Sequence, residues 1–190
     1  MADNEFGYTA WGRDWVRLAE PLSQTRPEPL LPRARRIARN GGVTLEIEGR
    51  MVRASIHRGM QASVTYLEIA ALPAATSAAV SEQIATATVE LADTVHERLR
   101  GAGISFAPRL HSTDCSCSAR TPRCLHHLAT CYALAAAVDE NPWLALDLQG
   151  YRDAGCASAD TESPPPRWTP IDTLDPARFF DVASAAGAQV

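Results

Sequence analysis

The chain has 190 residues and a formal net charge of −4, and arginine fills all 18 of its Lys+Arg positions. This length fits one domain with an extension, or one domain with a small satellite, and the acidic balance argues against a generally basic nucleic-acid protein. The polar residues 1–5 do not form a secretory signal, and no apolar run reaches the ~20 residues of a membrane span, so we expect a cytoplasmic protein without a membrane partner.

Residues 6–22 predict the first helix. Apolar side chains recur there at three- and four-residue spacing, on one helix face, at Trp11, Trp15, Leu18 and Leu22. Thr9 suits the N-cap and Pro21 the end of the helix. We interpret the aromatic stripe as a face that docks on the core, with a base-stacking platform as the alternative.

The densest positive charge lies in residues 33–39 and comes from Arg33, Arg35, Arg36 and Arg39. On a short helix these side chains would spread around much of the circumference. Two interpretations remain open: a solvated helix face, or a patch that contacts the phosphates of DNA. Gly41 and Gly42 supply a turn or a helix C-cap after the segment.

Three segments, 43–48, 51–57 and 62–69, have the composition of strands, and short turns join them. Such runs predict an antiparallel β-meander. Residues 76–100 are rich in helix formers and predict one or two helices, with an apolar face made by Ile84, Leu91, Val95 and Leu99.

Potential metal ligands gather after this region. They follow the pattern C-x-C, six residues, then C-x-H, formed by Cys115, Cys117, Cys124 and His126. Tetrahedral Zn²⁺ takes four nitrogen and sulfur ligands of this kind, and the six-residue loop allows the second pair to fold back onto the first. The odd total of five cysteines disfavours a complete disulfide framework. In a reducing compartment the cluster therefore predicts a zinc site.

The spacing also predicts how the ligands are presented. Positions two apart do not share a helix face, so we expect Cys124 just before a helix and His126 in its first turn. The apolar residues 128–138 predict that this helix is buried. Zinc with three thiolates and an imidazole carries a charge of −1, which Arg120 and Arg123 in the loop are placed to offset.

Two further residues could compete as ligands, namely His127 and Cys131. We expect His126 to be the fourth ligand and Cys131 to be a small buried helix residue. Four protein ligands leave no position for water, and no glutamate stands nearby as a base, so we expect a structural site without catalytic residues.

Residues 139–142 are expected to break the helix, and 143–148 to form another. Residues 155–168 have linker composition, and 175–184 predict a short helix in an acidic tail. We therefore divide the chain into an N-terminal α+β region (1–103), a zinc finger with following helices (104–152), and a linker with the tail (153–190).

The C-x-C and C-x-H pattern resembles the SWIM zinc finger. Four other segments extend this resemblance: Phe6-Gly7-x-Thr9-x-Trp11-Gly12-Arg13-x-Trp15, Ala38-Arg39-x-Gly41, Asp139-x-Asn141-Pro142-Trp143-Leu144 and Asp175-Pro176-x-x-Phe179. Together they are similar to bacterial, chiefly actinobacterial, SWIM zinc-finger proteins, which are often associated with SNF2-type helicases. The resemblance spans most of the chain.

The resemblance implies a finger made of a small β-hairpin and a helix (ββα), in a module that binds DNA or proteins. Family members commonly carry a basic residue where Leu125 stands, so this change weakens the interpretation that the finger contacts DNA. We expect a non-enzymatic α+β protein that binds Zn²⁺, has no small-molecule substrate and acts as an adaptor for an SNF2-type helicase. The alternative is a DNA-binding module that uses Arg33, Arg35, Arg36 and Arg39.

Overall fold

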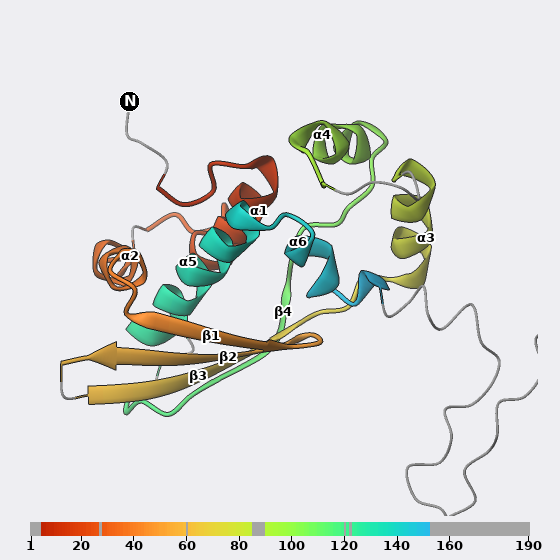
Figure 1. Ribbon diagram of the computed structural model, residues 1–190. Coiled ribbons are helices and arrows are strands. Elements are labelled where there is room, and N and C mark those ends of the chain that lie inside the picture. The colour runs from red at the N-terminus through yellow and green to blue at the C-terminus, as the bar shows by residue number, and fades with distance from the viewer. Residues whose placement is uncertain are drawn as a thin grey trace, which may run out of the picture. The chain divides into compact units, whose positions relative to one another are not determined.

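Four strands form one antiparallel sheet in the order β1-β2-β3-β4 (Figure 1). They are β1 (Val43–Glu48), β2 (Met51–Arg58), β3 (Gln61–Ile69) and β4 (Leu110–Cys115). In β1 and β2 apolar side chains recur at every second position, and Gly49 provides the turn between these strands with a φ of 54°. The computed structural model describes residues 5–26, 28–59, 61–84, 90–119, 121 and 123–152.

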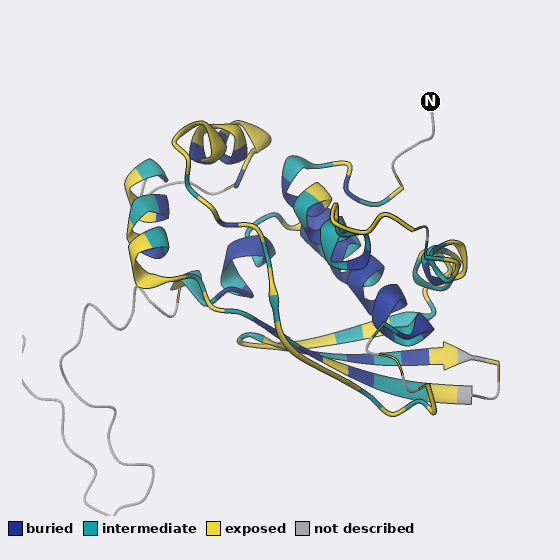
Figure 2. Ribbon diagram, turned by 180° about the vertical axis from the view of Figure 1, so that it is seen from behind, coloured by how far each residue is buried: buried dark blue, intermediate teal, exposed yellow. Residues whose placement is uncertain are grey.

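The helices lie on one side of the sheet (Figures 1 and 2). The buried apolar residues of the sheet are Val52, Ala54, Ile56, Leu67 and Ile69. They are α1 (Ala10–Ala19), α2 (Leu31–Arg39), α3 (Ala74–Gln83), α4 (Asp93–Gly101), α5 (Leu125–Glu140) and α6 (Leu144–Asp147). The predicted α+β class and antiparallel sheet are confirmed. Among the described residues, no helix combines the length and apolar character needed to cross a membrane.

The core is centred on α5, which carries buried residues along most of its length (Figure 2). Helix α1 packs on it and begins as predicted, because the hydroxyl of Thr9 accepts a hydrogen bond of 2.9 Å from the backbone N–H of Gly12. Trp11 and Trp15 are each 1% exposed. Their burial supports the interpretation of the aromatic stripe as a docking face and leaves no surface for base stacking.

The prediction for Leu22 was wrong. Helix α1 ends at Ala19, and its C-cap Glu20 has φ −126° and ψ 67°, which are not helical values. Leu22 therefore lies beyond the helix instead of continuing its apolar face, and it is 82% exposed. Pro21 follows the cap, in keeping with its expected role at the end of the helix.

Strand β4 links the part of the chain that carries the cysteines to the earlier strands. It pairs with β3, with Cys115 opposite Thr65. The described residues of the following loop (116–119, 121 and 123) contain no second strand, so the β-hairpin of the finger stays a prediction. The domain limits at 103 and 152 also stay predictions, and the linker and tail from 153 onward, with the expected helix at 175–184, lie outside the described residues.

Candidate metal centre

Three thiols and one imidazole converge where β4 meets the start of α5. The Sγ atoms of Cys115, Cys117 and Cys124 and a ring nitrogen of His126 all lie within 4.8 Å of one another. Nδ1 of His126 is 3.9 Å from Sγ of Cys115. These are the four residues that the sequence pattern indicated, and their arrangement could hold a metal ion.

Local structure positions each ligand. Cys115 ends β4 opposite Thr65, whose hydroxyl donates a hydrogen bond of 3.3 Å to the sulfur. Cys124 is the N-cap of α5, and its sulfur accepts a hydrogen bond of 3.4 Å from the backbone N–H of His127. His126 is the second residue of the helix. The predicted placement of the C-x-H pair, one residue before the helix and one in its first turn, is confirmed.

The spacing of the four atoms fits a tetrahedral ion. Metal–sulfur distances of about 2.3 Å and metal–nitrogen distances of about 2.0–2.1 Å would place the ligand atoms roughly 3.5–3.8 Å apart. The separations in the structure reach at most 4.8 Å, so a closing movement of about 1 Å completes the site. Thiolates and imidazole do not suit Mg²⁺ or Ca²⁺, because these cations take oxygen ligands.

The thiols differ in how readily they ionise. Burial raises the pKa of Cys124 to about 11, although the hydrogen bond from His127 opposes the rise. The pKa of Cys117 is lowered: burial acts to raise it, but hydrogen bonds with the backbone of Ala119 and with the thiols of Cys115 and Cys124 outweigh burial. Because a metal binds the thiolate, it must displace the proton of Cys124.

The two alternative ligands lie outside the group of four. His127 is 5% exposed and lines a hollow of about 140 Å³ that also reaches Cys115 and Cys124. Cys131 is fully buried within α5, and burial raises the pKa of its thiol to about 12. Its position agrees with the expectation of a small core residue.

Arg123 forms hydrogen bonds that the sequence did not indicate. Its guanidinium donates hydrogen bonds to the backbone carbonyls of Ala19 at 2.5 Å and Leu18 at 3.5 Å, and to the side chain of Gln24 at 3.4 Å. The contacts that the structure gives it are with the end of α1 and with Gln24 beyond that end. Its expected role in offsetting the charge of the metal thiolates stays a prediction. Arg120, the other arginine of that expectation, lies outside the described residues.

The arginines predicted to contact DNA do not form one free patch. On α2, Arg35 forms an ion pair with Glu20, and its Nε donates a hydrogen bond of 3.0 Å to the hydroxyl of Tyr132. The hydroxyl of Tyr132 in turn donates to Glu20. The pKa of Arg35 is raised, chiefly by its hydrogen bond to Glu20. This arginine is therefore part of the contact between α1, α2 and α5.

The other three arginines of α2 lie nearer the solvent. Arg39 forms an ion pair with Glu5. Arg33 and Arg36 are exposed, and among the described residues neither has an ion-pair partner. Only these two cations of the predicted patch are thus available to an anionic partner without competition from a carboxylate in the described part of the chain.

Asp139 has a role that the sequence did not lead us to expect, since we predicted that the helix breaks at this residue. Helix α5 continues through Glu140, and the carboxylate of Asp139 accepts hydrogen bonds from the backbone N–H groups of Gly7 (2.6 Å) and Thr9 (2.9 Å) and from the hydroxyl of Thr9 (2.7 Å). A Cβ on Gly12 would lie 2.0 Å from Oδ1 of Asp139. The sequence carried one signal for this role, namely an acidic residue in an apolar helix. A buried carboxylate needs hydrogen-bond donors around it.

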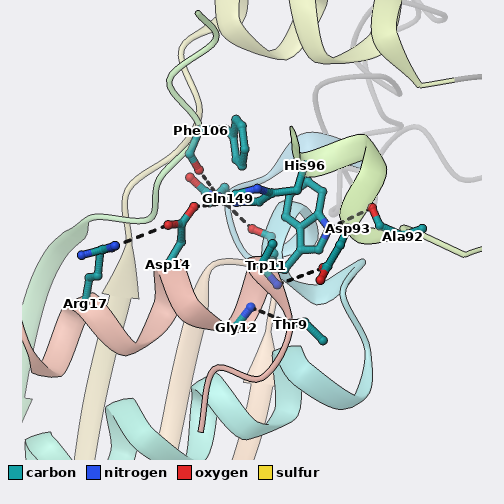
Figure 3. Close-up of polar contacts among 12 residues, drawn as sticks. Thr9, Trp11, Gly12, Asp14, Arg17, Ala92, Asp93, His96, Phe106 and Gln149 are labelled. Atoms are coloured by element: carbon teal, nitrogen blue, oxygen red, sulfur yellow. Dashed lines mark hydrogen bonds and ion pairs between the residues drawn. The ribbon is translucent and has the colours of Figure 1, made fainter. Parts of the chain in front are cut away.

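A polar pair with one buried member joins α1 to α4 (Figure 3). Asp14 and His96 are 2.8 Å apart, and the imidazole lies edge-on to the rings of Trp11 and Phe106 at 5.0 Å. His96 is 3% exposed. Figure 3 shows the imidazole beside the rings of Trp11 and Phe106, while Asp14 also faces Arg17, with which it forms an ion pair of 3.7 Å. The contact between Asp14 and His96 fastens α1 to α4.

Comparison of the chain with protein-family models, with curated proteins and with solved structures finds no match.

Proposed function

We propose that the chain is a zinc-binding module of the SWIM type that acts without catalysis, as an adaptor in protein contacts. The observation that supports this proposal is the convergence of Cys115, Cys117, Cys124 and His126 within 4.8 Å. The C-x-C pair starts at the end of a strand and the C-x-H pair at the start of a helix, an order compatible with the ββα finger that the resemblance implies.

Zinc is the ion that this donor set suits best. Three thiolates and one imidazole form a structural zinc set, and soft thiolate ligands favour zinc over the harder divalent cations. Bound zinc would cross-link β4, the loop and α5, and four protein ligands would leave no position for a reactive water. We therefore propose a stabilising site, in a chain with no small-molecule substrate, and place it in the reducing cytoplasm, where thiols stay available to the metal.

Protein contact is favoured over DNA contact by the charges. The chain is acidic, with a formal net charge of −4, and two of the four arginines of α2 are paired with carboxylates. The resemblance points to an SNF2-type helicase as the partner. DNA binding stays the second candidate because Arg33 and Arg36 are exposed, and phosphate contacts need such cations.

Metal analysis of the purified chain tests the central part of the proposal. We expect one zinc ion per chain, and after Co²⁺ substitution the absorption bands of a tetrahedral thiolate site. Cys117→Ser should lose the ion, and Cys131→Ser should retain it, because Cys131 lies outside the group of four. A parent protein that binds neither ion would overturn the proposal.

The choice of partner needs a separate pair of measurements. Purification of the tagged chain from its native host should recover an SNF2-type helicase with the parent protein and less of it with Cys117→Ser. DNA binding at low salt should be absent. If DNA binds with a steep salt dependence, and Arg33→Glu with Arg36→Glu reduces that slope while Arg98→Glu does not, the second candidate function holds instead.

A further inference from the structure

Arg123 lies in the loop between Cys117 and Cys124, called the metal loop below, and it connects this loop to the C-terminal end of α1. Its Nη2 lies 2.5 Å from the carbonyl oxygen of Ala19, and its Nη1 lies 3.5 Å from that of Leu18. The last carbonyls of a helix have no partner within the helix and carry partial negative charge. The guanidinium therefore supplies both hydrogen-bond donors and positive charge at the end of α1.

The residue that follows Arg123 is a candidate metal ligand. Cys124 is 3% exposed, and its sulfur both caps α5 and belongs to the group of four. Consecutive Cα atoms stay about 3.8 Å apart across a planar peptide bond. A shift of the Arg123 backbone therefore moves the cysteine, so one side chain and one peptide unit connect the end of α1 to the metal ligand.

The same side chain reaches the segment that follows α1. Nη2 of Arg123 lies 3.4 Å from Oε1 of Gln24. Between Ala19 and Gln24 in the sequence, Leu22 is 82% exposed and lines two hollows of about 330 and 370 Å³. Glu20 is bonded on the other side to Tyr132 of α5. The segment that carries this exposed leucine is thus attached both to the loop before Cys124 and to the middle of α5.

We infer that Arg123 is a positioning residue that couples the metal centre to the end of α1 and to the surface around Leu22. Bound metal fixes Cys124 and, through it, the guanidinium that holds the carbonyls. In the other direction, attachment of Arg123 to α1 holds Cys124 where the metal needs it. By linkage, the coupling free energy is the same in both directions.

The inference rests on the metal-binding part of the proposed function and adds a consequence for the adaptor role. Metal occupancy determines how firmly residues 18–24 are held in one conformation. This segment carries the exposed Leu22, which lines two hollows. The metal centre thereby acts on a surface outside its own loop.

Zn²⁺ affinity, measured by competition with a chromophoric chelator, tests the first direction. Arg123→Gln should weaken binding about 10-fold or more, in the range seen when groups that orient a metal ligand are removed, whereas Arg98→Gln should change it less than about twofold. Arg98 is a matched control because its Nη1 also donates to a backbone carbonyl, that of Gln83, at 3.1 Å. Arg123→Lys keeps the charge but has one nitrogen for two carbonyls, so it should restore only part of the affinity.

Amide hydrogen exchange tests the other direction. The N–H of Glu20 donates to the carbonyl of Val16 at 2.9 Å and reports on the end of α1. Removal of the metal with a chelator should speed exchange of this amide about 10-fold or more, while amides of the β1–β2 pair stay protected. In Arg123→Gln the Glu20 amide should exchange rapidly even with metal bound.

The outcomes separate the inference from the proposal on which it rests. Equal Zn²⁺ affinities of Arg123→Gln and Arg98→Gln, full recovery with Arg123→Lys, or unchanged Glu20 exchange on metal removal would each overturn the coupling. A parent protein that binds no Zn²⁺ would instead overturn the proposed metal-binding function.

Discussion

At one end of α5 the carboxylate of Asp139 accepts hydrogen bonds from groups just before α1, and at the other end Arg123 donates to the last carbonyls of α1. The two helices therefore run antiparallel and are fastened at both ends. The first fastening consists of protein atoms alone. The second adjoins Cys124, a residue of the candidate metal centre. One end of the helix pair is thus fastened by protein atoms alone, whereas the coupling inferred above would make the other end depend on whether the metal is bound.

The largest expected effect is the loss of metal-linked stability. Metal at about 1,000 times its dissociation constant stabilises a folded protein by about 4 kcal/mol. Cys124→Ser should abolish this gain, so urea unfolding with and without Zn²⁺ should give the same free energy of unfolding.

Cys131→Ala is the matched control for this prediction. It removes a cysteine from the same helix but outside the group of four, so it should keep the stabilisation by Zn²⁺. If Cys124→Ser responds to Zn²⁺ as strongly as the parent protein does, the metal does not hold this end of α5.

The second prediction concerns the end that needs no metal. In Gly12→Ala the new methyl group would overlap the carboxylate of Asp139, because the Cβ position is 2.0 Å from Oδ1. We expect a loss of about 3 kcal/mol in the free energy of unfolding, since overpacking in a tight contact displaces α1 or the carboxylate. The loss should be the same with Zn²⁺ and with a chelator.

Gly101→Ala provides the comparison. Gly101 also lies in a helix, but nothing is within 4 Å of its Cβ position. This substitution should leave stability unchanged or raise it by up to about 1 kcal/mol through helix propensity. A Gly12→Ala protein as stable as Gly101→Ala would show that the contact with Asp139 is loose.

Local patterns in the sequence predicted much of this architecture. Strands β1, β2 and β3 follow from their composition and from the short turns between them, and the four thiol and imidazole groups follow from the spacing C-x-C and C-x-H. Strand β4 was not predicted, because Leu110–Cys115 is mostly polar and exposed and has no alternating pattern. Its conformation is set by pairing with β3, a contact between distant parts of the chain.

The contacts of charged residues were also beyond prediction from local sequence. Arg35 and Arg39 were predicted to belong to a basic patch. Their partners, Glu20 and Glu5, lie 15 and 34 positions away in the sequence, so the pairing was not visible locally. The contacts of Arg123 with the end of α1 were not predicted, because these partners lie about a hundred positions earlier. In each case the tertiary fold decides whether the cation is free or paired.

The third prediction concerns Asp139 itself, at the end of α5 that needs no metal. Asp139→Asn keeps the shape of the side chain but removes its charge. It also replaces one acceptor oxygen by an amide NH₂ group, which would face either the N–H of Gly7 or the N–H and hydroxyl of Thr9. Hydrogen bonds to charged groups are each worth about 1.5–3 kcal/mol, so we expect a loss of about 2 kcal/mol. Glu140→Gln, at the exposed neighbouring position, should change stability by less than about 0.5 kcal/mol. If the two substitutions change the free energy of urea unfolding equally, the hydrogen bonds of Asp139 do not fasten this end of α5.

The smallest expected effect lies in the middle of α5, where Tyr132 bonds to Glu20 and Arg35. Tyr132→Phe should lower stability by about 1 kcal/mol at neutral pH, the typical worth of such a hydrogen bond. Burial, reinforced by Glu20, raises the pKa of Tyr132. Because the folded state holds this proton more tightly than the unfolded state, the contribution is complete below the ordinary tyrosine pKa of about 10 and is lost as pH rises through the higher folded value.

The parent protein should therefore lose stability above about pH 10 more steeply than Tyr132→Phe does. Tyr66→Phe is the control, because Tyr66 is 41% exposed, and it should keep the parent profile. Urea unfolding across this pH range, with a chelator present throughout, separates the effect from metal binding. A profile of Tyr132→Phe that matches the parent would mean that the two ends of α5 hold α1 without help from its centre.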